Sequence, residues 1–271
     1  MSDLTGKVAL ITGAARGQGR AHAVKLASRG ASIIALDLCG PLPESVKYRS
    51  ATKQDLDVTV ELLETAGAKV VPVVADVRDH AALLSGVGDA VDTLGRLDIA
   101  VANAGIAVVS EWDQITPRAF QDTIDINLVG SWNTVMAAAP HMQADGGSII
   151  LVSSAAGLRV QPFMVDYVAS KYAVTGMTKA FAAELAHYNI RVNSVHPTGV
   201  NTDMATDPSV QETIAAAIAR NPRPASLFNN MLDVNLVEVD DIANTVAYLV
   251  SDEAGFITGH AMTVDAGITL H

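Results

Sequence analysis

The stretch Thr12-Gly13-Ala14-Ala15-Arg16-Gly17-Gln18-Gly19, written TGAARGQG, joins an apolar run that starts at Lys7 to a helical pattern. Glycines at such a place let the backbone turn tightly and approach a pyrophosphate, where the free N–H groups of a helix start favour anions. A glycine trio alone is a weak signal, because small-residue turns share it. Asp37, however, ends the next apolar run 24 positions after Gly13 (37 − 13), near the roughly 20 expected for a residue that binds an adenosine ribose. The combined pattern predicts a dinucleotide-binding turn.

Short runs rich in Val, Ile and Ala alternate with longer helical patterns along the whole chain. Most of these runs are apolar at successive positions, as expected for parallel strands that are buried on both faces. The alternation predicts an α/β fold, a Rossmann-type doubly wound parallel sheet of about seven strands with helices on both faces. The expected strands are Lys7–Ile11, Ser32–Asp37, Lys69–Asp76, Leu97–Ala104, Ser148–Ser154, Ile190–Pro197 and Ala261–Asp265, and the expected helices include Gly17–Arg29, Asp79–Leu94, Pro117–Gln143 and Asp166–His187.

The composition restricts the classes of protein and of partner that the chain can be expected to have. The 271 residues contain no repeat, low-complexity tract or linker, so residues 1–271 are expected to form a single domain. The formal charge of −11 argues against nucleic acid or an anionic membrane surface as partner, because both are polyanions. The seven histidines lie far apart without metal-ligand spacing, so no metal site is expected.

The single cysteine, Cys39, excludes an internal disulfide and suits a reducing compartment. The first residues lack the basic region and apolar core of a signal peptide. No apolar run approaches the roughly 20 residues that span a bilayer. These features predict a cytoplasmic protein.

Tyr167 and Lys171 lie four positions apart in the segment DYVASKYAVTG, so on a helix they share one face. A phenol with a pKa of about 10 is a poor base at neutral pH, and a neighbouring ammonium group lowers that pKa toward the range that acid–base catalysis needs. The pair alone favours a solvated helix face over a catalytic role. Serines at the end of the strand that contains ILVSS, together with the glycine turn, favour a catalytic role.

These residues carry a family resemblance. The segments TGAARGQG, NAG at Asn103–Gly105, IN at Ile126-Asn127, SS at Ser153-Ser154 and YVASK at Tyr167–Lys171 resemble the motifs of the short-chain dehydrogenase/reductase family, in order and from Lys7 to Gly267. In that family the catalytic serine precedes the tyrosine by thirteen positions, which selects Ser154 (167 − 154 = 13) over Ser153.

The resemblance implies four catalytic residues. Tyr167 would exchange a proton with the substrate oxygen, and Ser154 would hydrogen-bond that oxygen. Lys171 would hold the nicotinamide ribose and lower the pKa of the tyrosine. Asn127 would hold a water that links Lys171 to solvent, although from the residues alone Asn127 is equally a polar residue satisfied by backbone.

The resemblance also implies a cofactor site. Asp76-Val77 would contact the adenine, Asn103–Gly105 would line the cleft, and Thr202 would receive the carboxamide. The full set implied to bind the cofactor is Gly13, Arg16, Gly17, Gln18, Gly19, Asp37, Leu38, Asp76, Val77, Asn103, Ala104, Gly105, Tyr167, Lys171, Pro197, Gly199, Val200 and Thr202.

Two segments depart from the wider family. Where most members have Pro-Gly after the sixth strand, this chain has HPTGVNTDM at His196–Met204, and it has DLCGP at Asp37–Pro41. Together they resemble the actinobacterial carveol-dehydrogenase-like subgroup that is coupled to the redox carrier mycofactocin. His196 is expected to be a structural residue at a strand end.

The chain after Asp37 predicts a long loop. Thr52-x-x-Asp55 has the pattern of a capping box that starts a helix, which leaves a loop of fourteen residues at 38–51 (51 − 38 + 1). Loops at such positions usually have about 2–6 residues. The extra length is either a tolerated insertion or a lid over the adenosine half of the cofactor, and the lid is favoured.

A second segment, at about 200–237, is expected to cover the substrate. Apolar side chains there, and others that follow the catalytic serine, predict a lipophilic pocket; they are Val160, Phe163, Met164, Met204, Leu227, Phe228 and Met231.

The sequence therefore predicts an NAD-dependent dehydrogenase that oxidises a lipophilic, carveol-like secondary alcohol to a ketone, with mycofactocin as a possible electron acceptor. One alternative is an NADPH-dependent ketone or 3-oxoacyl reductase, which Arg16 favours because it could meet a 2′-phosphate, and which the carboxylate of Asp37 opposes. Another is a non-catalytic nucleotide-binding sensor. Family likeness also implies a homotetramer.

Overall fold

Seven parallel strands form one sheet in the computed structural model, which describes residues 3–270. Their order across the sheet is β3-β2-β1-β4-β5-β6-β7, the Rossmann-type arrangement that the sequence predicted. The strands are β1 (Val8–Thr12), β2 (Ser32–Asp37), β3 (Val70–Val74), β4 (Ile99–Ala102), β5 (Gly147–Val152), β6 (Ile190–Pro197) and β7 (Ala261–Val264).

The strand order reverses beside β1, which pairs with β2 on one side and with β4 on the other. In open α/β sheets a ligand binds in the crevice outside the carboxyl ends of the strands at such a switch point. The glycine turn follows β1 and the Asn103–Gly105 segment follows β4, so both leave the sheet at this crevice. The topology thus places the two predicted cofactor segments side by side.

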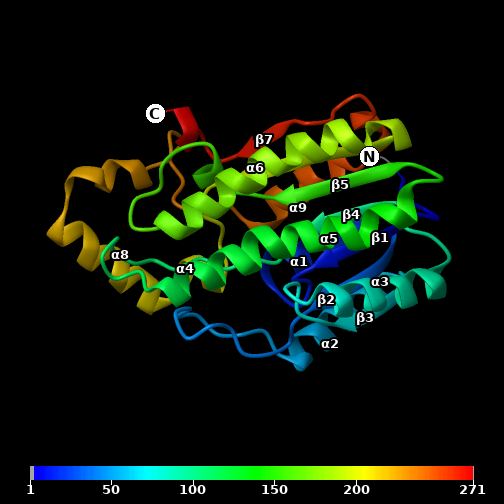
Figure 1. Cartoon of the computed structure of the whole chain (residues 1–271), viewed down its shortest axis with the longest axis horizontal. Coiled ribbons are helices and arrows are strands. Elements are labelled where there is room, and N and C mark those ends of the chain that lie inside the picture. The colour runs from blue at the N-terminus through cyan, green and yellow to red at the C-terminus, as the bar shows by residue number, and fades with distance from the viewer. Residues whose placement is uncertain (1–2, 271) are drawn as a thin grey trace.

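Helices cover both faces of the sheet (Figure 1). On one face α1 (Gly17–Ala27), α2 (Lys53–Thr65) and α9 (Val239–Leu249) share a buried cluster with alternate strand residues such as Ile11 and Ile33. The opposite face carries α3 (His80–Leu94), α5 (Gly130–Ala138) and α6 (Val165–Leu185).

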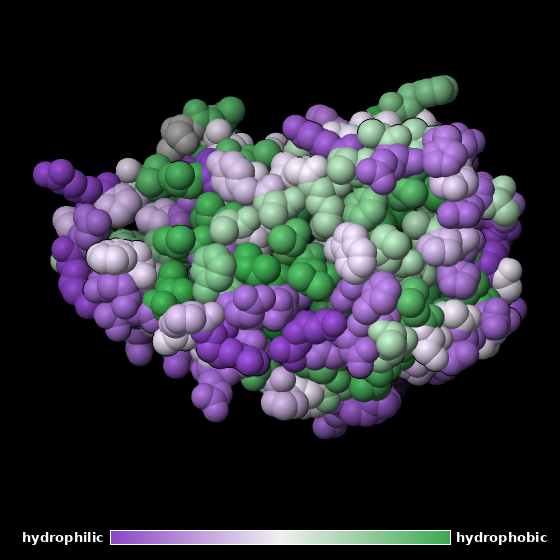
Figure 2. Space-filling view, viewed as in Figure 1, coloured by the Kyte–Doolittle hydropathy of each residue, from purple (hydrophilic) through white to green (hydrophobic). Residues whose placement is uncertain are grey.

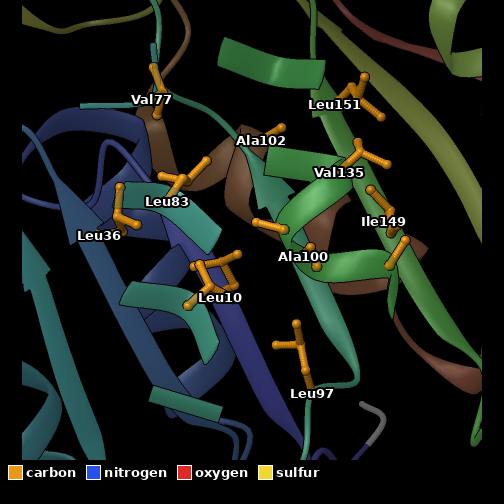
Figure 3. Packing of buried hydrophobic residues seen from close by; sticks show 14 of the residues in the cluster. Leu10, Leu36, Val77, Leu83, Leu97, Ala100, Ala102, Val135, Ile149 and Leu151 are labelled. Carbon is orange, nitrogen blue, oxygen red and sulfur yellow. The ribbon is translucent and has the colours of Figure 1, made fainter. Parts of the chain in front are cut away.

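Figure 3 shows this second core, in which side chains from neighbouring strands meet Leu83 of α3 and Val135 of α5. Leu10 and Leu36 point to this face, whereas Ile11 belongs to the other cluster. Burial on both faces explains why the strands lack polar alternation.

The region predicted as one helix at Pro117–Gln143 is divided into four parts. An α-helix, α4 (Pro117–Ile124), runs into a π-helical turn (Asp125–Val129), and α5 is followed by a 3₁₀ turn (Ala139–Met142). π-Turns are rare in helices overall, and those that do occur often lie at functional sites. This one contains Asn127, whose side chain is fully buried and directed at Ile106.

Two predicted strands, Lys69–Asp76 and Leu97–Ala104, are shorter in the structure. The sequence stays apolar beyond β4, but the N–H groups of Asn103 and Ala104 donate to Oγ1 of Thr12 instead of to a neighbouring strand. Side-chain hydrogen bonds at the carboxyl edge thus end the ladder before the apolar pattern ends.

Two long excursions leave the carboxyl edge. The first is the loop 38–51, after which Thr52 and Asp55 form the predicted capping box of α2. The second joins β6 to α9 and contains α7 (Asp203–Thr206), α8 (Pro208–Arg220) and a 3₁₀ turn (Arg223–Phe228). Figure 1 shows the loop and α8 extending beyond the same end of the sheet. None of the helices within residues 3–270 has the length and apolar character needed to cross a bilayer.

His22 of α1 is an unusual core residue. Its ring is completely buried, and neither ring nitrogen has a hydrogen-bond partner within the described chain. Burial disfavours the charged form and lowers the pKa of His22 from 6.5 to about 3.

This buried histidine makes stability depend on pH. Because the folded-state pKa lies below the unfolded one, the free energy of unfolding is unaffected above pH 6.5 and falls as the pH drops toward 3, by up to about 1.4 kcal/mol per pH unit for one proton. We expect His22→Leu to make this acid slope shallower in urea unfolding, and His141→Leu, at an exposed histidine, to leave it unchanged. Equal slopes for the wild type and His22→Leu would contradict this account.

Candidate active site

The glycine turn has the geometry of an anion cradle. Gly13 and Gly17 adopt φ values of +70° and +54°, in the left-handed region that favours glycine. A Cβ on Gly19 would overlap the carbonyl oxygen of Gly13, so the turn and the helix are in backbone contact. The first turn of α1 has no side-chain cap and no acidic residue. Its N–H groups are therefore available to a pyrophosphate.

Asp37 fixes the neighbouring edge of this cradle. Its carboxylate accepts a hydrogen bond from the N–H of Ala15, at 2.9 Å, and another from the N–H of Cys39, at 3.1 Å. The side chain is buried at the wall of the cleft. The arrangement suits a carboxylate that accepts from the hydroxyl groups of a ribose.

A cleft of about 600 Å³ lies at the carboxyl edge, within the size range of cofactor sites. It brings together most of the residues implied to bind the cofactor, namely Gly13, Arg16, Gly17, Gln18, Gly19, Asp37, Leu38, Asp76, Val77, Asn103, Ala104, Gly105 and Thr202.

Five implied cofactor residues do not line this cleft. Tyr167 and Lys171 lie on α6, and the other three lie at the end of β6 or just after it. Pro197 ends β6, and the carbonyl of Gly199 accepts from the N–H of Val237 at 2.9 Å. Val200 is buried and forms a parallel β-bridge with Val237. These residues anchor the start of the second excursion.

Lys171 lies between the cleft and the phenol of Tyr167. Its Nζ donates to the carbonyl of Val152 at 2.9 Å and lies 5.5 Å from the centroid of the Tyr167 ring. A Cβ on Gly105, which lines the cleft, would lie 3.6 Å from the same Nζ. The α6 helix thus places the phenol and the ammonium beside the cleft, one turn apart, as the sequence spacing predicted.

Burial dominates the titration of this pair. It lowers the pKa of Lys171 from 10.5 to about 8. Burial also raises the pKa of Tyr167, and a hydrogen bond with the Ser154 side chain acts in the opposite direction. The phenol is therefore protonated at neutral pH until a positive charge or a hydrogen-bond donor stabilises the phenolate.

The two adjacent serines have different partners. Ser153 Oγ donates to the carbonyl of Lys171 at 3.0 Å and also contacts Thr175. Ser154 accepts from the N–H of Ala156 and faces Tyr167. Ser153 is thus occupied inside the protein, and Ser154 is the serine beside the phenol.

His196 is buried beneath Ser154. Its Nδ1 lies 2.8 Å from the Ser154 carbonyl oxygen, and its Nε2 lies 2.8 Å from Oγ of Ser194. This placement agrees with the structural role expected for His196.

Asn127 is held by backbone. Its Oδ1 accepts from the N–H of Ile106 at 2.8 Å, and its Nδ2 donates to the carbonyl of the same residue at 2.9 Å and to Ser170 Oγ at 3.1 Å. The paired hydrogen bonds fix the chain that follows Gly105 against the π-turn. Asn127 therefore positions the floor of the cleft next to Lys171.

The apolar side of the site lies between the segment that follows Ser154 and the 3₁₀ turn of the second excursion. Phe163 stacks on Phe228 with ring centroids 6.3 Å apart. Phe163 has a φ of +61°, a costly value for an aromatic residue, and its carbonyl accepts from the N–H of Ser110. Arg159 is buried and donates to the carbonyls of Leu227 and Ile268.

Sequence reasoning did not identify several residues of the cleft wall, among them Tyr48, Arg49 and Asp203. Tyr48 and Arg49 come from the loop 38–51, and Asp203 comes from the second excursion. These residue types are common in loops, so the sequence gives no sign that the fold places the three side chains close together.

The fold and the site identify the class of protein. The chain belongs to the short-chain dehydrogenase/reductase family: residues 13–269 match a family model described as enoyl-(acyl carrier protein) reductase.

Two of the similar proteins are carveol dehydrogenases. The (−)-trans-carveol dehydrogenase of Rhodococcus erythropolis is 44% identical, and the match covers 100% of both chains. The carveol dehydrogenase of Mycobacterium avium, solved with NAD, is 43% identical with a TM-score of 0.94 and full coverage of both chains. A short-chain dehydrogenase of Mycobacterium paratuberculosis bound to NAD is 51% identical, with a TM-score of 0.97, 99% of this chain covered and 100% of the other.

The contact between Gly19 and Gly13 can be tested directly. Gly19→Ala places a methyl group in the space that the carbonyl oxygen of Gly13 occupies. We therefore expect it to lower the free energy of unfolding by about 1–3 kcal/mol and to weaken dinucleotide binding. Gly176→Ala on the exposed face of α6, where a Cβ meets no atom within 4 Å, should instead raise stability by about 0.5–1 kcal/mol. Denaturant unfolding and binding calorimetry measure both effects, and a Gly19→Ala protein with unchanged binding would contradict the close-contact role.

Proposed function

We propose that this protein is an NAD-dependent alcohol dehydrogenase that oxidises a lipophilic, carveol-like secondary alcohol to a ketone. The observation that carries the proposal is the placement of Tyr167, Lys171 and Ser154 beside a cleft that has a glycine cradle and Asp37 at its other end. The likeness to NAD-bound carveol dehydrogenase over the full chain supports the same function.

NAD held by the glycine turn and Asp37 would supply the hydride acceptor for the alcohol carbon. Ser154 donates a hydrogen bond to the alcohol oxygen and holds it at the phenol. Tyr167 takes the hydroxyl proton, so the alcohol loses one hydride and one proton and becomes a ketone. The ammonium of Lys171, 5.5 Å from the Tyr167 ring centroid, stabilises the phenolate that this proton transfer requires.

The apolar contacts around Phe163 and Phe228 favour a compact lipophilic alcohol. Val160, in the segment that follows Ser154, and Met231, in the second excursion, are exposed apolar side chains. A charged substrate would lose hydration here without gaining a partner. The rival reductase function depends on a 2′-phosphate beside Asp37, which the carboxylate would repel.

Removal of the Tyr167 hydroxyl tests the mechanism. Tyr167→Phe keeps the ring but removes the exchangeable proton, so we expect the rate of hydride transfer to fall by about 10²–10⁴-fold, with NAD binding retained. Tyr172→Phe, at an exposed tyrosine of the same helix, is the control. Single-turnover absorbance of NADH measures the rate, and a near-normal rate in Tyr167→Phe would exclude the assignment.

We further propose that the loop 38–51 is a lid that closes over the cofactor and slows its release. Seven of its residues line the cleft: Leu38, Gly40, Leu42, Pro43, Tyr48, Arg49 and Ala51. Tyr48 reaches farthest, since its buried hydroxyl accepts from the N–H of Ala107 at 3.1 Å, beyond the Asn103–Gly105 segment. Burial raises the pKa of Tyr48, so the hydroxyl stays neutral.

A retained cofactor has to be reoxidised in place. The likeness of DLCGP and HPTGVNTDM to the mycofactocin-coupled subgroup supports mycofactocin as the electron acceptor. Such an acceptor would enter from the substrate side, because the lid closes the other side.

Tyr48→Phe tests the lid with a minimal change. It removes only the hydrogen bond to Ala107, so we expect the dissociation rate of NAD to rise by about 5–10-fold, as measured by stopped-flow displacement. Tyr188→Phe, outside the cleft lining, is the control. If the wild type as purified contains no NAD and follows simple saturation kinetics in free NAD, the loop is an insertion and not a lid.

A homotetramer in the cytoplasm completes the proposal. Figure 2 shows apolar side chains gathered over the middle of one face. Exposed apolar residues of α4, the π-turn, α5 and α6 include Phe120, Val129, Trp132, Val165 and Tyr172. A second copy of the chain would bury them, and sedimentation measures the resulting mass. The free thiol of Cys39 suits a reducing compartment.

A further inference from the structure

Two arginines line the cofactor cleft near Asp37. Arg16 is the last residue before α1 in the glycine turn, and Arg49 lies near the end of the loop that follows β2. In proteins that bind NADP, an arginine near the ribose-binding carboxylate accommodates the 2′-phosphate. The chain therefore carries both an acidic group that opposes a 2′-phosphate and basic groups that could bind one.

Both guanidinium groups are engaged by one carboxylate. Nη1 of Arg16 donates to Oδ2 of Asp203, and Nε of Arg49 lies 3.0 Å from the same oxygen. Nη2 of Arg16 also donates to the carbonyl of Arg49 at 2.6 Å. Arg49 makes two further hydrogen bonds to Asp55, at 2.8 and 3.2 Å. Neither arginine is directed at the ribose carboxylate of Asp37.

Asp203 is well placed to hold this arrangement. It directly follows Thr202, whose Cγ2 would lie 3.4 Å from a Cβ on Gly17, so the second excursion touches the glycine turn here. The guanidinium of Arg16 also lies 5.7 Å from the ring centroid of Tyr48, which fixes its other side.

Exposed ion pairs add little to stability, and Asp203 is 42% exposed at its side chain. The network therefore acts on orientation, because it determines where the guanidinium groups of Arg16 and Arg49 point. An arginine bound to a carboxylate has fewer donors left for a phosphate.

We propose that Asp203 is a cofactor-specificity residue, which holds Arg16 and Arg49 away from the 2′-position of the adenosine ribose and acts with Asp37 to select NAD over NADP. This inference rests on the proposed function in one respect, namely that Asp37 binds the ribose hydroxyls. It assigns NAD selection to two carboxylates, one from β2 and one from the substrate-covering segment.

Removing either carboxylate alone should change NADP binding little, but for a different reason in each case. Asp37→Ala removes the repulsion but leaves both arginines on Asp203, so NADP gains little. Asp203→Asn keeps the shape of the side chain and removes its charge, which releases Arg16 from its carboxylate partner while Asp37 still repels the phosphate. Arg49 keeps its two hydrogen bonds to Asp55, so only the double variant should combine a neutral ribose site with a released Arg16.

Equilibrium dialysis against equal concentrations of NAD and NADP tests the proposal, with mass spectrometry of the nucleotides released from the dialysed protein. We expect the bound NADP/NAD ratio to rise by at least about tenfold from Asp37→Ala to Asp37→Ala with Asp203→Asn. Adding Arg16→Met to the double variant should reverse the rise.

The matched control is Asp207→Asn in the Asp37→Ala background, because Asp207 lies on the same segment and accepts from Ser209. An equal ratio in the double variant and in Asp37→Ala would overturn the proposal, as would an equal rise with Asp207→Asn. A wild type that binds the two nucleotides equally would instead refute the role of Asp37, so the two failures are distinguishable.

Discussion

The contact between the ends of β1 and β4 is the constraint on which the rest of the site depends. Oγ1 of Thr12 accepts from the N–H groups of Asn103 and Ala104, and Nδ2 of Asn103 donates back to the Thr12 carbonyl at 3.0 Å. These hydrogen bonds join the two segments at the switch point of the sheet. They fix the glycine turn, the floor of the cleft and, through Gly105, the distance to Lys171.

A buried ammonium beside a buried phenol is the second determinant of the chemistry. Burial lowers the pKa of Lys171, which donates to the Val152 carbonyl and has no carboxylate partner among the ion pairs of the described chain. Such a cation is stabilised by hydroxyl oxygens and by any negative charge that forms nearby. In the proposed reaction that charge is the phenolate of Tyr167, which has to be present before the tyrosine takes the alcohol proton.

The two long segments that line the cleft contact each other as well as the sheet. The loop after β2 and the excursion after β6 approach through Arg49 and Asp203. The excursion also contacts the segment that follows Ser154, through Phe228 and Phe163. Loops on a rigid scaffold carry specificity because their changes leave the core intact. Cofactor choice and substrate choice can therefore vary here without altering the sheet.

The sequence by itself determined the sheet, the glycine turn and the spacing of Tyr167 and Lys171, because these follow from local periodicity and from motifs within one or two elements. It also located the long loop, through the capping box of α2. It did not determine the π-turn at Asn127 or the meeting of Arg16, Arg49 and Asp203. That contact joins positions separated by up to 187 residues (203 − 16). Only the tertiary structure decided it, since charged loop residues have no periodicity and their partners depend on how the sheet brings distant loops to one edge.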